Sequence, residues 1–410
     1  MHEQHTQGEN DGRLSLTPRR GTAIFGLLVI GDLSANLAPL MILAMDTDLG
    51  LRESSAGTVL AGHLVANAVA CLIAARWAAQ GGRRRLALAG LVTMAVGCAL
   101  AAAIPSRAVA AVGIVVSGFG GGGVAAAGGA ALAALRGSNR AVALSGLINR
   151  ILAAAVLALV PALGIRMSTT FGVVAALALL GTCVTSWLPT PTAQSRAVDL
   201  RKASAEPTGR IVVAGRVLLA CFAVWAVGED SLWAVTGTMG AANAALTQHQ
   251  IGLALSASTA GGILAALVLA VVGSRFGRTV PVVAGLLAGG ALKLTACIVT
   301  EPSAYLAVII AWNTIYAAVF MYVIAIAAAL DPSGRWSASA IGAYILGSSV
   351  APLFGTVVSE SLGYRAFGYC LAVISLTVTI PLAAIARSSD RIENSCLATA
   401  PARADKVLFQ

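Results

Sequence analysis

Charged residues are scarce in this chain: Asp, Glu, Lys and Arg make up 11% of its 410 residues, against about 25% in a typical soluble domain. Aromatic residues reach only 5%. Hydrophobic residues account for 58%, and glycine raises the apolar share to about 69%, whereas a soluble domain has about 45–50%. The mean hydropathy of +0.85 agrees with this high apolar share. These values exclude soluble enzymes, nucleic-acid binders and disordered chains, and they predict a polytopic membrane protein.

Motifs that carry catalytic or metal chemistry are also missing. The seven cysteines form no C-x-x-C or C-x-H pattern and six fall inside apolar stretches, so we expect packing residues and no metal site. No H-E-x-x-H, G-x-S-x-G or paired-aspartate protease pattern supports an intramembrane enzyme. The chain has no Walker motif, so we do not expect nucleotide hydrolysis to power its activity. We therefore predict no enzymatic activity and no cofactor. A membrane-embedded receptor or scaffold is one class of protein that these absences leave open.

Apolar runs long enough to cross a membrane, about 20 residues, recur along the chain. Cutting at charged and turn-forming clusters gives twelve of them, at 21–45, 54–75, 86–104, 108–135, 141–165, 168–188, 211–240, 247–272, 279–300, 303–330, 336–361 and 366–386. The longest interior polar stretch follows the sixth run. We predict an all-α membrane protein with twelve transmembrane helices in two pseudo-symmetric six-helix bundles, residues 21–189 and 211–387, joined by a linker at 190–210.

Polar segments flank the two bundles. Residues 1–20 contain no apolar run with a cleavage site, so they predict a cytoplasmic tail rather than a signal peptide. Residues 388–410 predict a second cytoplasmic tail. Its last four residues, 407–410, resemble the remnant that a viral 3C protease leaves when a purification tag is removed.

Basic residues indicate the orientation in the membrane. The net charge of +10 would suggest a nucleic-acid partner if the chain were soluble. With a cytoplasmic N-terminus, 21 of the 27 Lys and Arg residues lie in cytoplasmic segments, four on the opposite side and two inside spans. This bias predicts that both termini and the linker are cytoplasmic, in a bacterial-type plasma (inner) membrane. The expected partners are therefore the lipid bilayer, a small-molecule substrate and protons, with no nucleic acid, and we expect a monomer.

The loops after the second and eighth predicted helices resemble each other. Both are rich in Gly and Arg, at 80–85 and 273–278, and alignment of Gly82 with Gly277 gives an offset of 195 residues. Two six-helix halves at a fixed offset are typical of duplicated transporter folds.

This organisation is similar to that of the major facilitator superfamily over nearly the whole chain. The signature of that family in these loops is G-x-x-x-D-R-x-G-R-R. The residues kept here are Gly82, Arg83 and Arg84 in the first copy and Arg275, Gly277 and Arg278 in the second, whereas neither copy keeps the Asp. The resemblance implies a secondary transporter that alternates between inward-open and outward-open states, with these loops latching helix ends during gating.

Two further fragments bear on the direction of transport. The fifth predicted helix keeps Pro161 and Gly164 of a G-P-x-x-G-G pattern, which resembles the antiporter signature of the family. In the fourth helix, Ile114 stands where many drug antiporters of the family carry an Arg. The glycine run at 118–123 lacks the strand and the Lys of a phosphate-binding loop, so we predict close helix packing there.

Five charged residues lie in predicted spans well away from their ends, where each costs about 2.5–3.5 kcal/mol and is therefore a functional candidate. They are Asp32, Arg150, Glu229, Asp230 and Lys293. Asp32 falls at the midplane, and the repeat offset carries it to position 227, close to Glu229 and Asp230. The resemblance places helices one and seven beside the central cavity. Because a buried carboxylic acid binds a proton more readily than an exposed one, we predict that Asp32, Glu229 or Asp230 is the proton-coupling site.

The two intramembrane bases allow alternative roles. Arg150, near the middle of the fifth span, is either a counter-ion for Asp32 or an anchor for an anionic substrate group. Lys293 lies nearer the outer end of the ninth span, where a long side chain can reach the interface, so we favour a structural role. We predict that Arg150, its neighbour Asn149, and Asn36, one turn from Asp32, contact the substrate.

Aromatic side chains form a stripe along the tenth span. Trp312, Tyr316 and Phe320 recur every four residues, with Asn313 beside them. Core packing is one interpretation. Because the resemblance places the tenth helix against the cavity, we predict that these four residues line a site for a small organic molecule.

These observations together predict a proton-coupled secondary active transporter of a small organic molecule that works by alternating access. Efflux of a drug or metabolite by antiport is favoured, and the alternative is a proton symporter that imports a small organic solute. The mixture of acids with Arg150 is compatible with a zwitterion, an organic acid or a cation.

Overall fold

The computed structural model describes residues 14–135, 138–189, 209–272, 277–330 and 335–399, and these residues are almost entirely helical. The helices are α1 (Pro18–Asn36), α2 (Ala38–Leu49), α3 (Glu53–Ala79), α4 (Arg83–Ala103), α5 (Arg107–Ala133), α6 (Ser138–Leu163), α7 (Met167–Val184), the short 3-10 helix η1 (Thr185–Trp187), α9 (Gly209–Asn243), α10 (Gln248–Val272), α11 (Thr279–Ala296), α12 (Pro302–Leu330) and α13 (Arg335–Thr399). Most of the predicted linker, the outer parts of both tails, the protease-site remnant and Arg275 lie outside the described residues.

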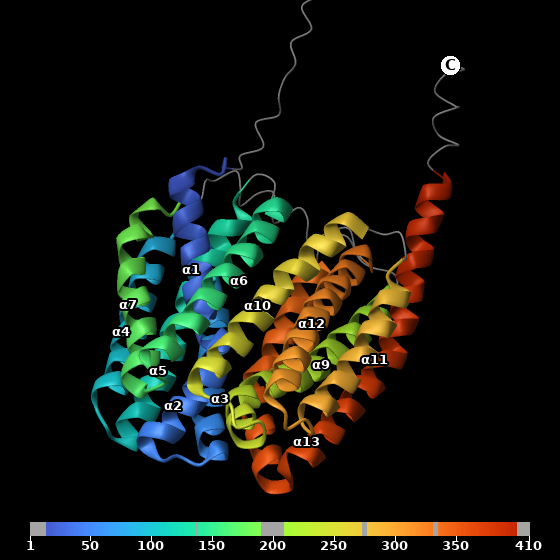
Figure 1. Ribbon diagram of the computed structural model, residues 1–410. Coiled ribbons are helices and arrows are strands. Elements are labelled where there is room, and N and C mark those ends of the chain that lie inside the picture. Colours follow the sequence, from blue (N-terminus) through green and yellow to red (C-terminus); the bar gives the residue numbers. More distant parts are fainter. Residues whose placement is uncertain (1–13, 136–137, 190–208, 273–276, 331–334, 400–410) are drawn as a thin grey trace, which may run out of the picture.

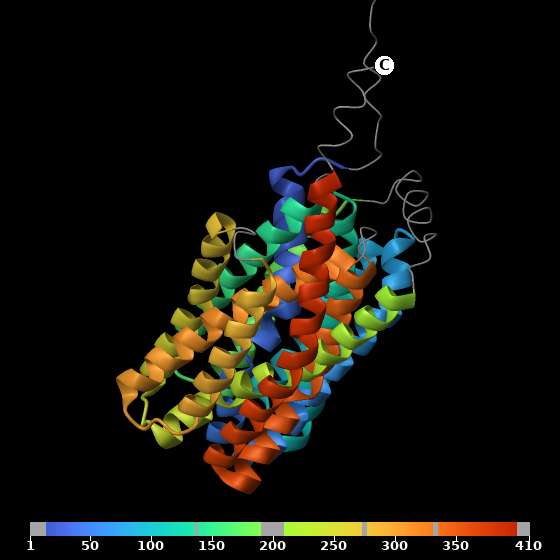
Figure 2. The same cartoon turned by 90° about the vertical axis from the view of Figure 1, so that its right-hand side faces the viewer.

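Two bundles of helices lie side by side, α1–α7 in the first and α9–α13 in the second (Figure 1). Ten of the described helices are long and apolar enough to cross a membrane singly, and the bent pair α1–α2 makes an eleventh span. The start of α1 and the end of α13 lie at the same end of the molecule in both views (Figures 1 and 2); we refer to it as the terminal end. These features confirm the predicted all-α membrane fold.

Helix α13 is much longer than one membrane crossing. Its 65 residues would extend about 98 Å as a single helix, about three times the 30 Å thickness of a hydrocarbon core. Gly363 breaks the helix with φ 80° and ψ 160°, a conformation that only glycine adopts readily. The break falls between the eleventh and twelfth predicted spans, so α13 supplies both of them. It then continues well past the predicted end of the last span at 386.

The first predicted span is also broken, because α1 and α2 meet at Leu37 with an angle of 53°. Pro39 explains this break, since it has no N–H to donate to Ala35 and its ring clashes with that carbonyl group. From the second bundle, Trp233 of α9 points its Nε1–H at the carbonyl oxygens of Ala35 and Asn36, at 3.3 and 3.2 Å. The indole therefore compensates for the missing helical hydrogen bond and joins the two bundles.

The glycine run of α5 packs neighbouring helices closely, as the sequence predicted. A Cβ atom on Gly118 would lie 2.1 Å from the backbone oxygen of His63 in α3, and one on Gly122 would lie 2.1 Å from the backbone oxygen of Asn67. Only a hydrogen atom fits at these two positions. The run is therefore a helix-packing surface and not a phosphate-binding loop.

We expect Gly118→Ala to lower the free energy of unfolding by about 1–3 kcal/mol, because the added methyl group forces α3 and α5 apart. Gly129→Ala is a matched control on the same helix, since no atom lies within 4 Å of the Cβ position of Gly129. Thermal unfolding of the purified proteins in detergent, followed by tryptophan fluorescence, compares the two. Equal midpoints for both variants would contradict the packing role of Gly118.

Polar contacts between the bundles gather at the end opposite the terminal end. Arg52, at the start of α3, forms an ion pair of 2.8 Å with Glu360 of α13. Beside it, Glu53 accepts hydrogen bonds from Thr238 of α9 and Tyr364 of α13, at 2.5 and 3.3 Å. These contacts join the first bundle to both crossings near Gly363 and hold the molecule closed at that end.

Candidate functional site

Asp32 of α1 lies within electrostatic reach of the second bundle. Its side chain is exposed, and its carboxylate interacts repulsively with that of Asp230 on α9. Among the described residues, no basic group lies within ion-pair distance of Asp32, so the structure does not contain the pairing with Arg150 that the sequence allowed. Asn36 donates to the backbone oxygen of Asp32 at 3.2 Å and to Asn149 of α6 at 3.5 Å. Within the described part of the chain, Asp32 thus presents a carboxylate without a counter-ion.

Asp230 interacts with hydroxyl groups instead of a base. The Tyr344 hydroxyl of α13 lies 3.0 and 2.9 Å from the two carboxylate oxygens, and Ser348, one turn further on, donates a short hydrogen bond to Oδ2. Because the Tyr344 proton points at the carboxylate, Tyr344 accepts in turn from Tyr316 of α12, whose hydroxyl is 2.5 Å away. Within the part of the chain that the structure describes, Asp230 has no cationic partner.

Glu229, the neighbour of Asp230, has both oxygens engaged. Its Oε1 lies 2.6 Å from the Nζ of Lys293 on α11, and its Oε2 accepts the Nε1–H of Trp312 on α12 at 2.6 Å. The Lys293 side chain is 0% exposed and that of Glu229 is 3% exposed. The interpretation that Lys293 reaches the membrane interface is therefore wrong, because the side chain ends on Glu229 in the interior. Trp312 and Asn313 are both buried.

Arg150 extends from α6 to the second bundle. Its Nη1 donates to the backbone oxygen of Thr259 in α10 at 3.4 Å, and the guanidinium lies over Gly262, where a Cβ would be 2.1 Å from Nη1. Its charge also acts on Tyr316. The bond to Thr259 is the single hydrogen bond of this side chain among the described residues. Arg150 is therefore a cation between the bundles with donors left for a ligand.

Aromatic rings surround the two hydrogen-bonded tyrosines. Tyr344 lies against Phe222 and Phe320, with ring centroids 5.2 and 5.0 Å away, and Tyr316 stacks on Trp225 at 5.4 Å. Tyr316, Phe320 and Tyr344 are half-buried. The aromatic stripe predicted on α12 is thus one side of a cluster to which α9 and α13 also contribute.

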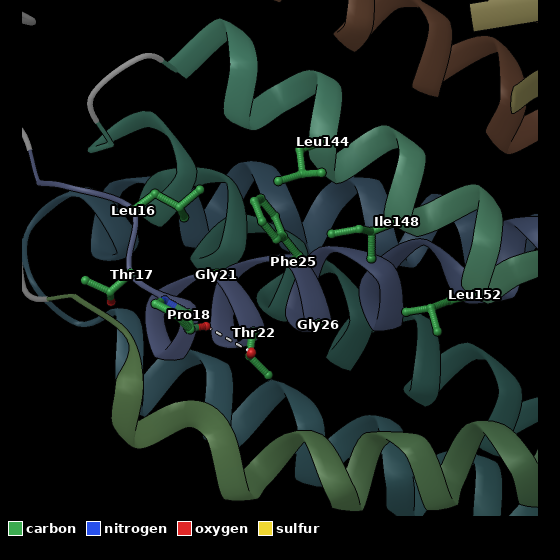
Figure 3. A pocket seen from close by; sticks show the side chains of 10 residues that line it. All are labelled: Leu16, Thr17, Pro18, Gly21, Thr22, Phe25, Gly26, Leu144, Ile148 and Leu152. Atoms are coloured by element: carbon green, nitrogen blue, oxygen red, sulfur yellow. Dashed lines mark hydrogen bonds between the residues drawn. The ribbon is translucent and has the colours of Figure 1, made fainter. Parts of the chain in front are cut away.

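An apolar pocket of about 600 Å³ lies between the first turns of α1 and helix α6 (Figure 3). Its lining residues are Leu16, Thr17, Pro18, Gly21, Thr22, Phe25, Gly26, Leu144, Ile148 and Leu152. Along α1, Asp32 lies seven residues beyond Phe25, which is about two turns or 10 Å on the same helix face. The pocket and Asp32 therefore lie along the same face of α1.

The first predicted gating loop makes local contacts. Gly82 precedes α4 as its N-cap residue, and Arg83 turns back so that its Nε donates to the backbone oxygen of Ala78 at 2.9 Å. Arg83 is buried and Arg84 is exposed.

The second predicted gating loop is joined to the end of α13. Gly277 has a φ of 63°, and Asp390 accepts hydrogen bonds from the backbone N–H groups of Arg278 and Thr279, at 2.9 and 3.1 Å. The guanidinium of Arg278 also donates to Ser389 at 2.7 Å. Asp390 therefore supplies a carboxylate to a loop whose sequence lacks the Asp of the family signature.

Sequence reasoning did not identify Tyr344, Ser348 or Asp390. Tyr344 and Ser348 lie four residues apart in an apolar span, so a polar pair on one helix face was the available signal. Asp390 fell in a predicted tail, and nothing local indicated that the helix would continue. In the described residues, no group of three His, Cys, Asp or Glu side chains could hold a metal ion.

Two helical membrane bundles with charged side chains in the space between them define a polytopic carrier. The sequence profile of the Major Facilitator Superfamily matches residues 23–242, more than half of the chain. The chain therefore belongs to the major facilitator superfamily, and it is a membrane transporter rather than an enzyme.

Solved structures share the fold at low sequence identity. The human organic anion transporter MFSD10 (TETRAN) aligns at 16% identity with a TM-score of 0.66, covering 90% of this chain and 100% of its own. A variant of the peptide transporter POT aligns at 14% identity with a TM-score of 0.69, covering 93% of this chain and 98% of its own. The same variant in complex with alafosfalin aligns at 14% identity with a TM-score of 0.69, covering 92% of this chain and 96% of its own. No curated protein matches the chain in sequence.

Proposed function

We propose that this transporter is proton-coupled and exchanges protons for a small organic cation, as an efflux antiporter. The observation that carries the proposal is the pair of carboxylates Asp32 and Asp230, which come from different bundles, repel each other and have no basic partner in the described part of the chain. Such a pair attracts either a cation or protons. The two ligands therefore compete for the same negative charge.

Competition between the two ligands is the basis of exchange. A carrier that changes conformation with either a proton or a cation on its carboxylates moves one species in each direction. Release of the cation on one side then requires that a proton replaces it. No contact between the two ligands is needed, because the shared negative charge couples them.

The aromatic cluster and the apolar pocket support an organic cation as the substrate. Tyr316, Phe320 and Tyr344 present ring surface beside Asp230, and aromatic faces attract cations. The pocket between α1 and α6 offers apolar surface about two helical turns from Asp32. A cation with an apolar body matches both features.

The orientation that we propose follows from the distribution of Lys and Arg, with both termini in the cytoplasm of a cell bounded by a bacterial-type inner membrane. The contacts of Arg52 and Glu53 with the second bundle then close the extracytoplasmic side. The state described here would accept substrate from the cytoplasm, which is the loading state of an exporter. We expect the monomer to be the functional unit, because each bundle pair encloses its own site.

Import by proton symport is the second candidate, and Arg150 is the observation that favours it. A guanidinium between the bundles can bind an anionic substrate group, while the carboxylates bind a cationic group or a proton. The substrate would then be a zwitterion or an organic acid that enters together with a proton.

The direction of the driving gradient distinguishes the two candidates. In proteoliposomes with the membrane potential clamped, antiport predicts that ethidium accumulates when the interior is acidic and that nigericin, which collapses the pH gradient, abolishes accumulation. Symport predicts accumulation of a neutral dipeptide when the exterior is acidic. Transport of both probes that is indifferent to the pH gradient would contradict proton coupling altogether.

A further inference from the structure

The ion pair between Glu229 and Lys293 lies in the interior of the second bundle. The two charged atoms are 2.6 Å apart, and the side chains are 3% and 0% exposed. The pair joins α9 to α11, and the hydrogen bond from Trp312 adds α12. Removing charges from water is unfavourable unless the partners compensate each other, so each member of this pair requires the other.

The ion pair lies directly beside a second carboxylate, Asp230, so its role extends beyond packing. Glu229 and Asp230 are consecutive residues, yet their partners among the described residues differ completely: Glu229 contacts an ammonium and an indole, whereas Asp230 accepts hydrogen bonds only from hydroxyl groups. Two adjacent carboxylates that were both free to titrate would each affect the proton affinity of the other. A fixed positive charge beside one of the two carboxylates keeps that carboxylate from competing with its neighbour for a proton.

We propose that Lys293 is a positioning residue that holds Glu229 ionised and excludes it from proton exchange, so that Asp230 is the only acid of the adjacent pair that exchanges protons. This inference rests on the proposed proton coupling. It assigns the proton to one of the two neighbouring carboxylates, and it gives Lys293 a role in setting the number of protons that the carrier binds.

Among the described residues, the charged and titratable groups around the two acids lie on five other helices. Their names and positions are Lys293 on α11, Tyr316 on α12, Tyr344 on α13, Asp32 on α1 and Arg150 on α6. Of these, Lys293 alone forms an ion pair with either acid among the described residues. Removing its charge therefore leaves Glu229 with no cation in contact among the described residues and only the Trp312 hydrogen bond to stabilise its charge, so we expect Glu229 to take up a proton in such a variant.

Infrared absorption by protonated carboxylic acids tests this inference on the full-length carrier at neutral pH, without substrate. Relative to wild type, we expect K293M to add the signal of one protonated carboxylic acid, and we expect the double variant E229Q/K293M to lose that added signal. E229Q in the wild-type background should remove no such signal. A purely structural role for Lys293 would change the unfolding temperature but would not produce this pattern.

A second measurement keeps the test decisive if K293M does not fold. The charge-neutral double variant E229Q/K293M should keep the pH profile of ethidium transport within about 0.5 pH units of wild type, because the pair takes no part in proton exchange. Loss of the pH dependence in the double variant, or loss of a protonated-acid signal on E229Q alone, would overturn the inference. Failure of the proposed antiport would appear differently, as absent gradient-driven transport in wild type with the infrared pattern intact.

Discussion

Asp230→Asn is expected to reduce pH-gradient-driven transport of an organic cation at least about a hundredfold. The substitution keeps the volume of the side chain and an oxygen that can accept from Tyr344, but it removes the negative charge and the proton-binding group. A charge pair at 4 Å is worth about 4 kcal/mol at an effective dielectric constant of 20, and each 1.4 kcal/mol is about tenfold in affinity. Initial rates of ethidium accumulation in proteoliposomes provide the measurement.

Asp46→Asn is the matched control for this experiment. Asp46 lies on α2, its side chain is exposed, and it belongs to the end of the molecule opposite the terminal end. The chemical change is the same, so transport should stay within about twofold of wild type. Wild-type rates for Asp230→Asn, or equal losses for both variants, would show that the Asp230 carboxylate is not the coupling group.

Lys293→Met is expected to lower the free energy of unfolding by about 3–5 kcal/mol, because Glu229 loses its counter-ion and must take up a proton to remain buried. Methionine fills a similar volume, so the loss of charge dominates the effect. The comparison is made by thermal unfolding in detergent, followed by tryptophan fluorescence. This is a larger effect than we expect for any single substitution on the surface of the bundles.

Two controls accompany the Lys293 prediction. Arg84→Met removes an exposed charge on α4 and should change stability by less than about 0.5 kcal/mol. The double variant E229Q/K293M removes both charges and should recover most of the lost stability. If the double variant is less stable than Lys293→Met, the ion pair does not account for the loss.

The all-α membrane fold could be predicted from the sequence because each crossing requires a long apolar run and each turn interrupts it with charge. The repeat offset also carried Asp32 to position 227, close to the acids of the seventh span. Breaks inside helices were harder to predict. The break at Pro39 has a local cause that the sequence shows. The break at Gly363 lies in a short loop between two predicted spans, and hydropathy alone does not distinguish this loop from the others.

The partners of the charged residues could not be predicted, since they depend on helix rotation and packing. Distance along the ninth span placed Lys293 near an interface, but the direction of its side chain sends the ammonium to Glu229. Arg150 was weighed as a partner of Asp32 on the grounds of charge alone, whereas packing directs it across the bundle interface to α10. Linear sequence identified the charges correctly but not how they are paired.

The hydrogen bonds from Trp233 to the carbonyl groups of Ala35 and Asn36 have a consequence for the transport cycle. When the two bundles separate at the end opposite the terminal end, the Trp233 indole withdraws. The Ala35 carbonyl group, which Pro39 cannot satisfy, then needs another hydrogen-bond donor. Water entering the new opening is the available one. Wetting of the α1–α2 bend is thus built into the opening step, so the barrier to that step should respond to osmotic stress, which withdraws water from narrow spaces.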